Sequence, residues 1–223
     1  ARLATLATSA LEHILCTRET ARCILEDVGF ELETEDIIIA NDPYAGGSHL
    51  PDVTMLMPLF SQGEPLLFPL VRAHLPDIGG ARPGGLHPQA YEIHQEGLRI
   101  TPVFLTKGGR FREDVLRKLL KNSRTPTDMK STLDAMSAAL RVGAHRLTEL
   151  VQQQGREQLF SALESIFSYT ERLFLTEISG IPQGTYTGES LCDTDFQGAR
   201  DIKLQVAITV SASSISMDFS QSH

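Results

Sequence analysis

The tetrapeptide His-Leu-Pro-Asp occurs twice in this sequence, at residues 49–52 and 74–77, and each copy adjoins a glycine pair. Histidine and carboxylate side chains are ligands that zinc, manganese and iron accept in proteins. The proline in each copy favours a rigid extended turn over a helix. A single copy would be an ordinary solvated turn, whereas two copies at the ends of a predicted strand pair indicate a metal-binding site.

The segment between the two copies predicts a β-hairpin. Residues 53–60 and 66–71 are largely apolar, and residues 61–64, Ser-Gln-Gly-Glu, are turn formers. A tight turn there would return the second strand antiparallel to the first. His49 and His74 would then approach each other at the open end of the hairpin.

The composition excludes several classes of protein. The 223 residues include 41% hydrophobic side chains, enough for the core of one domain or of two small ones. A net charge of −8 without a local basic stripe argues against a nucleic-acid partner. No apolar run approaches the roughly 20 residues that span a bilayer, and a signal peptide is not visible, so we expect a soluble cytoplasmic protein. Cys16, Cys23 and Cys192 lack CxxC spacing and are expected to be buried, reduced thiols.

Hydrophobic periodicity predicts a mixed α+β fold in three segments. Residues 1–110 are expected to form the hairpin, strands and loops that carry the metal site, residues 111–180 long antiparallel helices, and residues 181–223 β-strands. The irregular stretch 77–88 is longer than most connections, which favours a functional loop. The expected helices cover 18–27, a segment from 112 that stops at Asn122, an apolar stripe from 133 to 151 that ends at Gly155, and 159–175; the expected strands are 36–40, 185–188, 202–210 and 215–219.

Residues 41–54, Asn-Asp-Pro-Tyr-Ala-Gly-Gly-Ser-His-Leu-Pro-Asp-Val-Thr, resemble a motif of the hydantoinase B/oxoprolinase family. This family comprises large subunits of ATP-dependent hydantoin and lactam hydrolases, one half of 5-oxoprolinase, and related subunits of ketone carboxylases. The resemblance extends over the whole chain and implies an internal fragment of a longer protein. Further matching stretches lie at residues 74–80, 83–84, 95–100, 122–126 and 218–220.

The resemblance implies a divalent metal, zinc, manganese or iron, held by His49, Asp52 and His74. In some relatives a further acidic ligand lies before the position that corresponds to residue 1. Two imidazoles and one carboxylate leave coordination positions open for water and a substrate carbonyl. The sequence departs from the family pattern at Leu75 and Pro76, where the usual motif has a second histidine and an alanine. This departure bears on activity more than on metal binding.

Three carboxylates are the candidate catalytic residues. Asp77 is a candidate to orient a ligand imidazole, and Asp42 and Glu96 are candidates for proton transfer. Asp42 and Glu96 have an alternative interpretation as solvated carboxylates, because the chain carries 28 Asp and Glu residues. Four histidines in helical or loop patterns are not expected to bind metal: His13, His87, His94 and His145.

The resemblance implies an enzyme that hydrolyses cyclic amides, with hydantoin, 5-oxoproline or lactam rings as substrates. Metal-assisted attack would follow activation of the amide by a partner ATPase, since this chain has neither a GxxxxGKS/T nor a GxGxxG motif to cradle a nucleotide. The expected partner is a hydantoinase A-type ATPase subunit or domain in a hetero-oligomer, and the isolated fragment is expected to be inactive. Two alternatives stay open: a subunit of an ATP-dependent ketone carboxylase, and a non-catalytic assembly module of the same fold.

Overall fold

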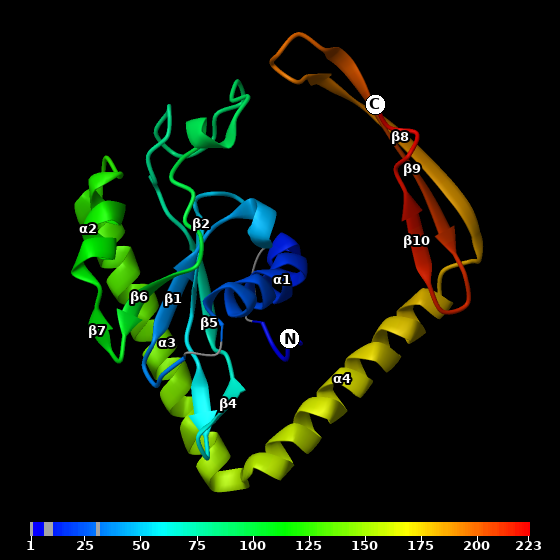
Figure 1. Ribbon diagram of the computed structural model, residues 1–223. Coiled ribbons are helices and arrows are strands. Elements are labelled where there is room, and N and C mark those ends of the chain that lie inside the picture. Colours follow the sequence, from blue (N-terminus) through cyan, green and yellow to red (C-terminus); the bar gives the residue numbers. More distant parts are fainter. Residues whose placement is uncertain (1, 7–10, 30–31) are drawn as a thin grey trace. The chain divides into compact units, whose positions relative to one another are not determined.

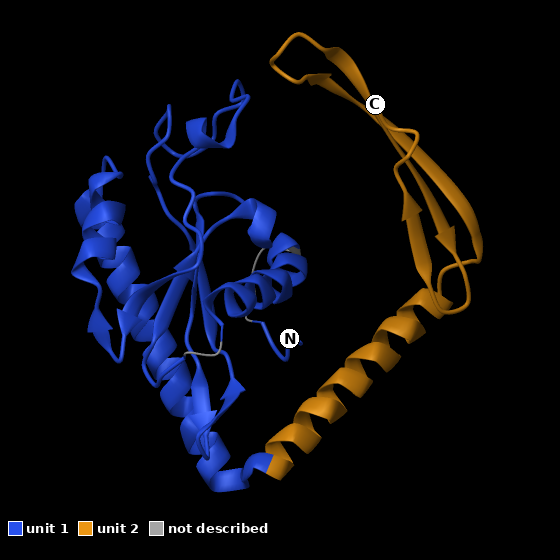
Figure 2. Cartoon of the chain, viewed as in Figure 1, with its two compact units in different colours: residues 1–156 blue, residues 157–223 orange. Residues whose placement is uncertain are grey.

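The computed structural model describes residues 2–6, 11–29 and 32–223 (Figure 1). Helices and antiparallel strands occur together along the chain, which confirms the predicted mixed α+β class. The chain divides into two compact units, residues 1–156 and 157–223 (Figure 2). The three-segment division, which follows secondary-structure content, stays a prediction.

A five-stranded antiparallel sheet forms the centre of the first unit. Two neighbouring strands, Ile37–Ala40 and Asp52–Leu56, are buried at every position, so side chains on both faces of the sheet are covered. In spatial order the strands are β5 (Leu70–His74), β2 (Asp52–Leu56), β1 (Ile37–Ala40), β6 (Val103–Lys107) and β7 (Arg110–Phe111).

Helices cover both faces of this sheet (Figure 1). α1 (Leu11–Val28) packs on the face to which Ile38 points. α2 (Glu113–Lys121) and α3 (Pro126–Gln154) pack on the opposite face, to which Ile37 points. Successive residues of a strand point to opposite faces, which is why one short apolar strand joins two hydrophobic clusters.

The predicted hairpin exists, but it is interrupted halfway along. β2 pairs with β5, so Asp52 lies opposite His74 at the open end. Pro58 and Pro69 then interrupt the ladder, because proline has no N–H to donate. Each strand predicted between the two tetrapeptides is therefore two strands. The outer pair forms a separate two-stranded sheet of β3 (Leu59–Ser61) and β4 (Glu64–Leu67).

The ends of the helices in the first unit agree with the sequence, but the starts of α1 and α3 do not: α3 begins at Pro126, seven residues before the predicted stripe at 133. The sequence predicts residues 18–27, whereas α1 begins at Leu11 and therefore also carries His13. α2 ends at Lys121 and is capped by Asn122, the predicted stop, whose N–H donates to carbonyls of the last turn. α3 ends at Gly155, whose φ of +82° suits glycine.

Two strands of the sheet lie outside the predicted set. β6 pairs with β1 inside the sheet. β7, a strand of two residues, pairs with β6 at the edge of the sheet. Thr106 in β6 is fully buried, and its hydroxyl donates to Glu35 O at 2.8 Å. Gly108 and Gly109, both with positive φ, turn the chain between the two strands.

The second unit joins a long helix to a three-stranded antiparallel sheet. The helix, α4 (Arg156–Ser179), agrees with the apolar stripe predicted at 159–175. The strand predicted at 185–188 is longer in the structure than in the prediction, because its pairing with the following strand continues to Thr194. The sequence also predicts that the long helices of residues 111–180 are antiparallel, and this stays a prediction. In spatial order the strands are β10 (Ile215–Asp218), β9 (Arg200–Val210) and β8 (Gly184–Thr194).

The three cysteines are free thiols, as their spacing predicts, but their expected burial is wrong: Cys16 and Cys23 are partly exposed and Cys192 is exposed. Cys16 lies on α1, where its sulfur accepts a hydrogen bond from Arg72 Nη1 at 2.5 Å.

Among the described residues, no helix has the length and apolar character that a membrane span requires.

Candidate functional site

The first tetrapeptide is carried by the loop between β1 and β2. Asn41, at the start of this loop, is fully buried. Its side-chain nitrogen donates to Leu50 O at 2.6 Å and to Leu98 O at 2.9 Å, and its Oδ1 accepts from Ile100 N at 2.6 Å. Because these bonds cross to other segments, Asn41 fixes the start of the loop to its end and to the irregular segment 98–100 that precedes β6.

Gly46 brings this loop into contact with α1. Its φ of +82° is a left-handed conformation that favours glycine. A Cβ at this position would lie 2.4 Å from Thr20 N and 2.6 Å from Glu19 C, both backbone atoms of α1. The Thr20 hydroxyl donates a hydrogen bond to Gly46 O. The missing side chain therefore allows α1 to lie directly against the loop.

Asp52 is the centre of the site, and its side chain is only 3% exposed. Its Oδ1 lies 2.7 Å from Nδ1 of His74. Its Oδ2 accepts a hydrogen bond from the Ser48 hydroxyl and lies 3.4 Å from the backbone nitrogen of His49. Burial raises the pKa of Asp52, but the hydrogen bonds from Ser48, His74 and His13 outweigh burial and hold the pKa at about 2. The carboxylate is therefore ionised at neutral pH.

The two histidines of the tetrapeptides meet beside Asp52, as the hairpin predicts. The ring centroids of His49 and His74 are 6.3 Å apart, with an angle of 78° between the ring planes. Both rings are exposed, so the site is open to solvent on their side. The donor types suit a divalent metal. In the described part of the chain, however, no three His, Cys, Asp or Glu side chains are arranged to hold an ion, and the metal assignment stays a prediction.

His13 is a member of this site that the sequence does not indicate. Its helical pattern predicts an ordinary surface or core histidine, but its Nε2 lies 3.4 Å from Asp52 Oδ2. The sequence does not predict this contact with Asp52, and the expectation that His13 does not bind metal stays a prediction. Thirty-nine residues separate the two side chains in sequence, so spacing carries no signal for their contact.

Asp77, in the second tetrapeptide, has different partners. Its carboxylate accepts bonds from the backbone nitrogen and Nη1 of Arg124, at 2.5 and 2.8 Å, and from the Ser123 hydroxyl at 3.2 Å. Burial raises the pKa of Asp77, but the bonds from Arg124 outweigh burial and lower it below its usual range. These partners tie Asp77 to the junction between α2 and α3. Its proposed role in orienting a ligand imidazole stays a prediction.

The two candidates for proton transfer lie in neighbouring loops. Asp42 forms an ion pair with Arg99 at 2.6 Å, and it caps the short helix η1 (Pro43–Ala45) by accepting from Tyr44 N. Glu96 follows a second short helix, η2 (Ile93–Gln95), and is half-buried. No described contact joins either carboxylate to Asp52, and their catalytic roles stay predictions.

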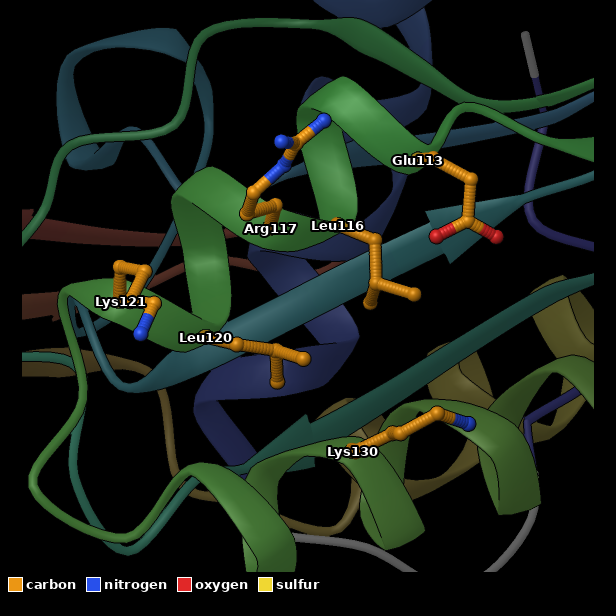
Figure 3. A pocket seen from close by; sticks show the side chains of 6 residues that line it. All are labelled: Glu113, Leu116, Arg117, Leu120, Lys121 and Lys130. Atoms are coloured by element: carbon orange, nitrogen blue, oxygen red, sulfur yellow. The ribbon is translucent and has the colours of Figure 1, made fainter.

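A groove between α2 and α3, of about 290 Å³, is separate from this site (Figure 3). Two leucines of α2 point into it, and charged side chains surround them. None of its lining residues belongs to the predicted site. The lining consists of Glu113, Leu116, Arg117, Leu120, Lys121 and Lys130.

Comparison with known proteins decides the family of this chain. The family model described as hydantoinase B/oxoprolinase matches residues 1–223. The chain belongs to the hydantoinase B/oxoprolinase family. This match confirms the resemblance indicated by the motif at residues 41–54.

Proteins similar to this chain match it over most of its length. Caprolactamase subunit beta from Pseudomonas jessenii is 33% identical over 189 residues, which cover 85% of this chain and 32% of that protein. The crystal structure of ATP-dependent caprolactamase from the same organism matches with a TM-score of 0.87 and 30% identity, over 92% of this chain and 36% of that one. A nucleotide-free structure of acetone carboxylase has the same fold, with a TM-score of 0.84 and 18% identity over 97% and 30% of the two chains. This chain thus spans about a third of the length of these relatives.

The structure also shows the surroundings of Leu75 in this hydantoinase B/oxoprolinase family member, the position at which the sequence resemblance implies a second histidine. Leu75 is fully buried in the larger hydrophobic cluster, and its backbone nitrogen donates to Pro51 O at 2.8 Å. Residue 75 follows His74 at the end of β5, and successive side chains of a strand point to opposite sides. The leucine therefore packs into the core, whereas His74 faces the site.

Proposed function

We propose that this chain is the metal-binding part of an ATP-dependent hydrolase that opens cyclic amides, with hydantoin, 5-oxoproline or lactam rings as the substrate class. The observation that carries the proposal is the meeting of His49, Asp52 and His74 at one end of the β2–β5 ladder. Membership of the hydantoinase B/oxoprolinase family supports it. The similarity to a protein named ATP-dependent caprolactamase supports hydrolysis of a ring amide.

His49, Asp52 and His74 would hold a divalent zinc, manganese or iron ion, which supplies polarisation of an amide carbonyl when bound. Asp52 is ionised, as a carboxylate ligand must be. Ser48 fixes one of its oxygens by a hydrogen bond. The exposed imidazoles leave the approach to the site free for a substrate ring on their side.

The chain is proposed to need an ATPase partner. An unactivated amide is a poor electrophile, and phosphorylation of its oxygen makes it a good one. This sequence carries no phosphate-binding motif, and a relative of it is named as the beta subunit of its enzyme. We therefore expect a hetero-oligomer with a hydantoinase A-type subunit or domain that handles ATP.

Metal analysis of the intact protein tests the assignment of the site. His49→Ala and His74→Ala variants are expected to lose bound divalent metal while staying folded, because each removes one exposed donor. His145→Ala is the matched control, since His145 is an exposed histidine of α3 whose contact is with Glu149. Full metal retention in both site variants would refute the assignment.

Isotope labels test the reaction. With the intact protein and its ATPase partner, oxygen-18 from water is expected in the ring-opened acid. Carbon-13 from bicarbonate in a β-keto acid, without opening of any cyclic amide, would indicate a ketone carboxylase instead. Absence of both products together with normal assembly would indicate a non-catalytic module. Phosphate release by this chain alone would contradict the need for a partner.

A further inference from the structure

We infer that His13 is a positioning residue of the proposed metal centre: its imidazole holds Oδ2 of Asp52, so that Asp52 and His74 stay in a fixed arrangement. The inference rests on the proposed function, because it assigns His13 a role at the same site. His13 is not part of the tetrapeptides, and it reaches the site from α1.

The contacts of Asp52 divide between its two oxygens. Oδ1 faces His74 Nδ1 at 2.7 Å, across the β2–β5 ladder. Oδ2 faces Ser48 on its own loop and His13 Nε2 at 3.4 Å on α1. A carboxylate can rotate about its last bond unless both oxygens are held. The contact with His13 therefore adds α1 to the loop and to β5, which hold Asp52 through Ser48 and His74.

The exposure of the histidines distinguishes their roles. The side chain of His74 is 50% exposed, whereas that of His13 is 17% exposed. His13 thus lies beneath the open side of the site and against the buried carboxylate. This is the position of an outer partner that orients a metal ligand, and such partners are common around carboxylate and histidine ligands.

The face of α1 that presents His13 is anchored to the site by other contacts. Thr20 lies seven residues after His13, two helical turns along the same face. Thr20 donates to Gly46 O and accepts from Arg72 Nη2 at 2.7 Å, while Arg72 Nε donates to Thr54 on β2 at 2.8 Å. These bonds fix the register of α1 against the loop and the sheet, and with it the place of His13.

The test uses the intact protein, freed of metal and titrated with cobalt(II). In His13→Leu the bulk on α1 is kept and the polar contact is lost, whereas in His13→Gln an amide nitrogen remains near the position of Nε2. We expect His13→Leu to weaken cobalt(II) binding about 10–100-fold and to shift the visible absorption of the bound ion. His13→Gln is expected to retain the wild-type spectrum, with affinity within about threefold of wild type. Thermal unfolding confirms that each variant is folded.

The outcomes separate this inference from the proposed function. Unchanged affinity and spectrum in His13→Leu would overturn the inference, and so would equal losses in His13→Leu and His13→Gln. If His49→Ala and His74→Ala also retain cobalt(II), the metal centre itself is refuted. If those two variants lose the ion while His13→Leu keeps it, the metal centre stands and only the role of His13 fails. His145→Ala, on the far helix α3, is the control for loss of an imidazole elsewhere.

Discussion

The two copies of His-Leu-Pro-Asp are identical in sequence and different in their surroundings. Their leucines, Leu50 and Leu75, are both buried in the same hydrophobic cluster. Their aspartates diverge: Asp52 is bound by histidines and a serine, whereas Asp77 is bound by Arg124 and its neighbour. The two leucines thus pack alike, while the contacts of the carboxylate depend on the element that lies against it.

The glycine pairs explain which structural element lies against each copy of the tetrapeptide. Gly46, before the first copy, lies against the backbone of α1. Gly79, after the second copy, lies so close to Asn122 that an added Cβ would be 2.6 Å from its carbonyl oxygen. The first copy is therefore joined to the helix that carries His13, and the second to the junction of α2 and α3. Only His74 of the second copy returns to the site.

The largest expected effect separates the two aspartates by metal binding. Asp52→Asn should weaken divalent metal binding by at least about 100-fold, because loss of a direct ligand exceeds the 10–100-fold loss typical of outer partners. Asp77→Asn should leave metal affinity close to wild type, because Asp77 is held by Ser123 and Arg124. Metal titration of the two intact variants measures the difference. Equal losses of affinity would show that both carboxylates serve the metal.

Replacement of the two leucines should show that the copies are alike in packing. Leu50 and Leu75 are 1% and 0% exposed, so Leu50→Ala and Leu75→Ala should each lower the free energy of unfolding by about 2–5 kcal/mol. Urea unfolding measures both. Metal affinity should be retained in the folded Leu75→Ala variant, because this side chain faces the core. A loss below about 1 kcal/mol at Leu75 would contradict a packing role there.

Sequence predicts the centre of the site because its geometry is local. A hairpin between the tetrapeptides sets Asp52 opposite His74, and a register of this kind follows from the turn and the apolar runs. The interruption at Pro58 and Pro69 is also visible in the sequence, since proline cannot donate to a ladder. The sequence predicts a continuous hairpin because the residues on either side of both prolines are apolar.

The remainder of the site depends on tertiary contacts that spacing does not reveal. His13 reaches Asp52 only because Gly46 lets α1 lie against the loop. The partners of Asp77 come from a helix junction more than 40 residues away in sequence. Periodicity predicts that α1 has an apolar face, but it does not predict which loop the helix contacts or in which register.

A third prediction concerns the close approach between the first copy and α1. Gly46→Ala should lower the free energy of unfolding by about 1–3 kcal/mol more than Gly84→Ala, because its Cβ would overlap α1. The two glycines have similar φ values, +82° and +88°, but a Cβ at Gly84 meets no atom within 4 Å. The cost of backbone strain is therefore similar in the two variants and cancels in the comparison. Urea unfolding measures the free energy of unfolding of both. Equal losses would mean that α1 adjusts without cost.

The smallest expected effect is the dependence of stability on pH at the second aspartate. The folded-state pKa of Asp77 lies below its ordinary value of 3.8, so its ion pair with Arg124 stabilises the fold at pH values above that value. Asp77→Asn should therefore lower the free energy of unfolding at about pH 7 by about 1–2 kcal/mol, a modest loss because Arg124 is 43% exposed. The difference between wild type and variant should persist down to about pH 5 and shrink as the pH falls below 3.8 through the folded-state pKa, where the carboxylate takes up a proton. Urea unfolding of both proteins across this range measures it. A difference that grows on acidification would show that Asp77 is not held as an ionised partner of Arg124.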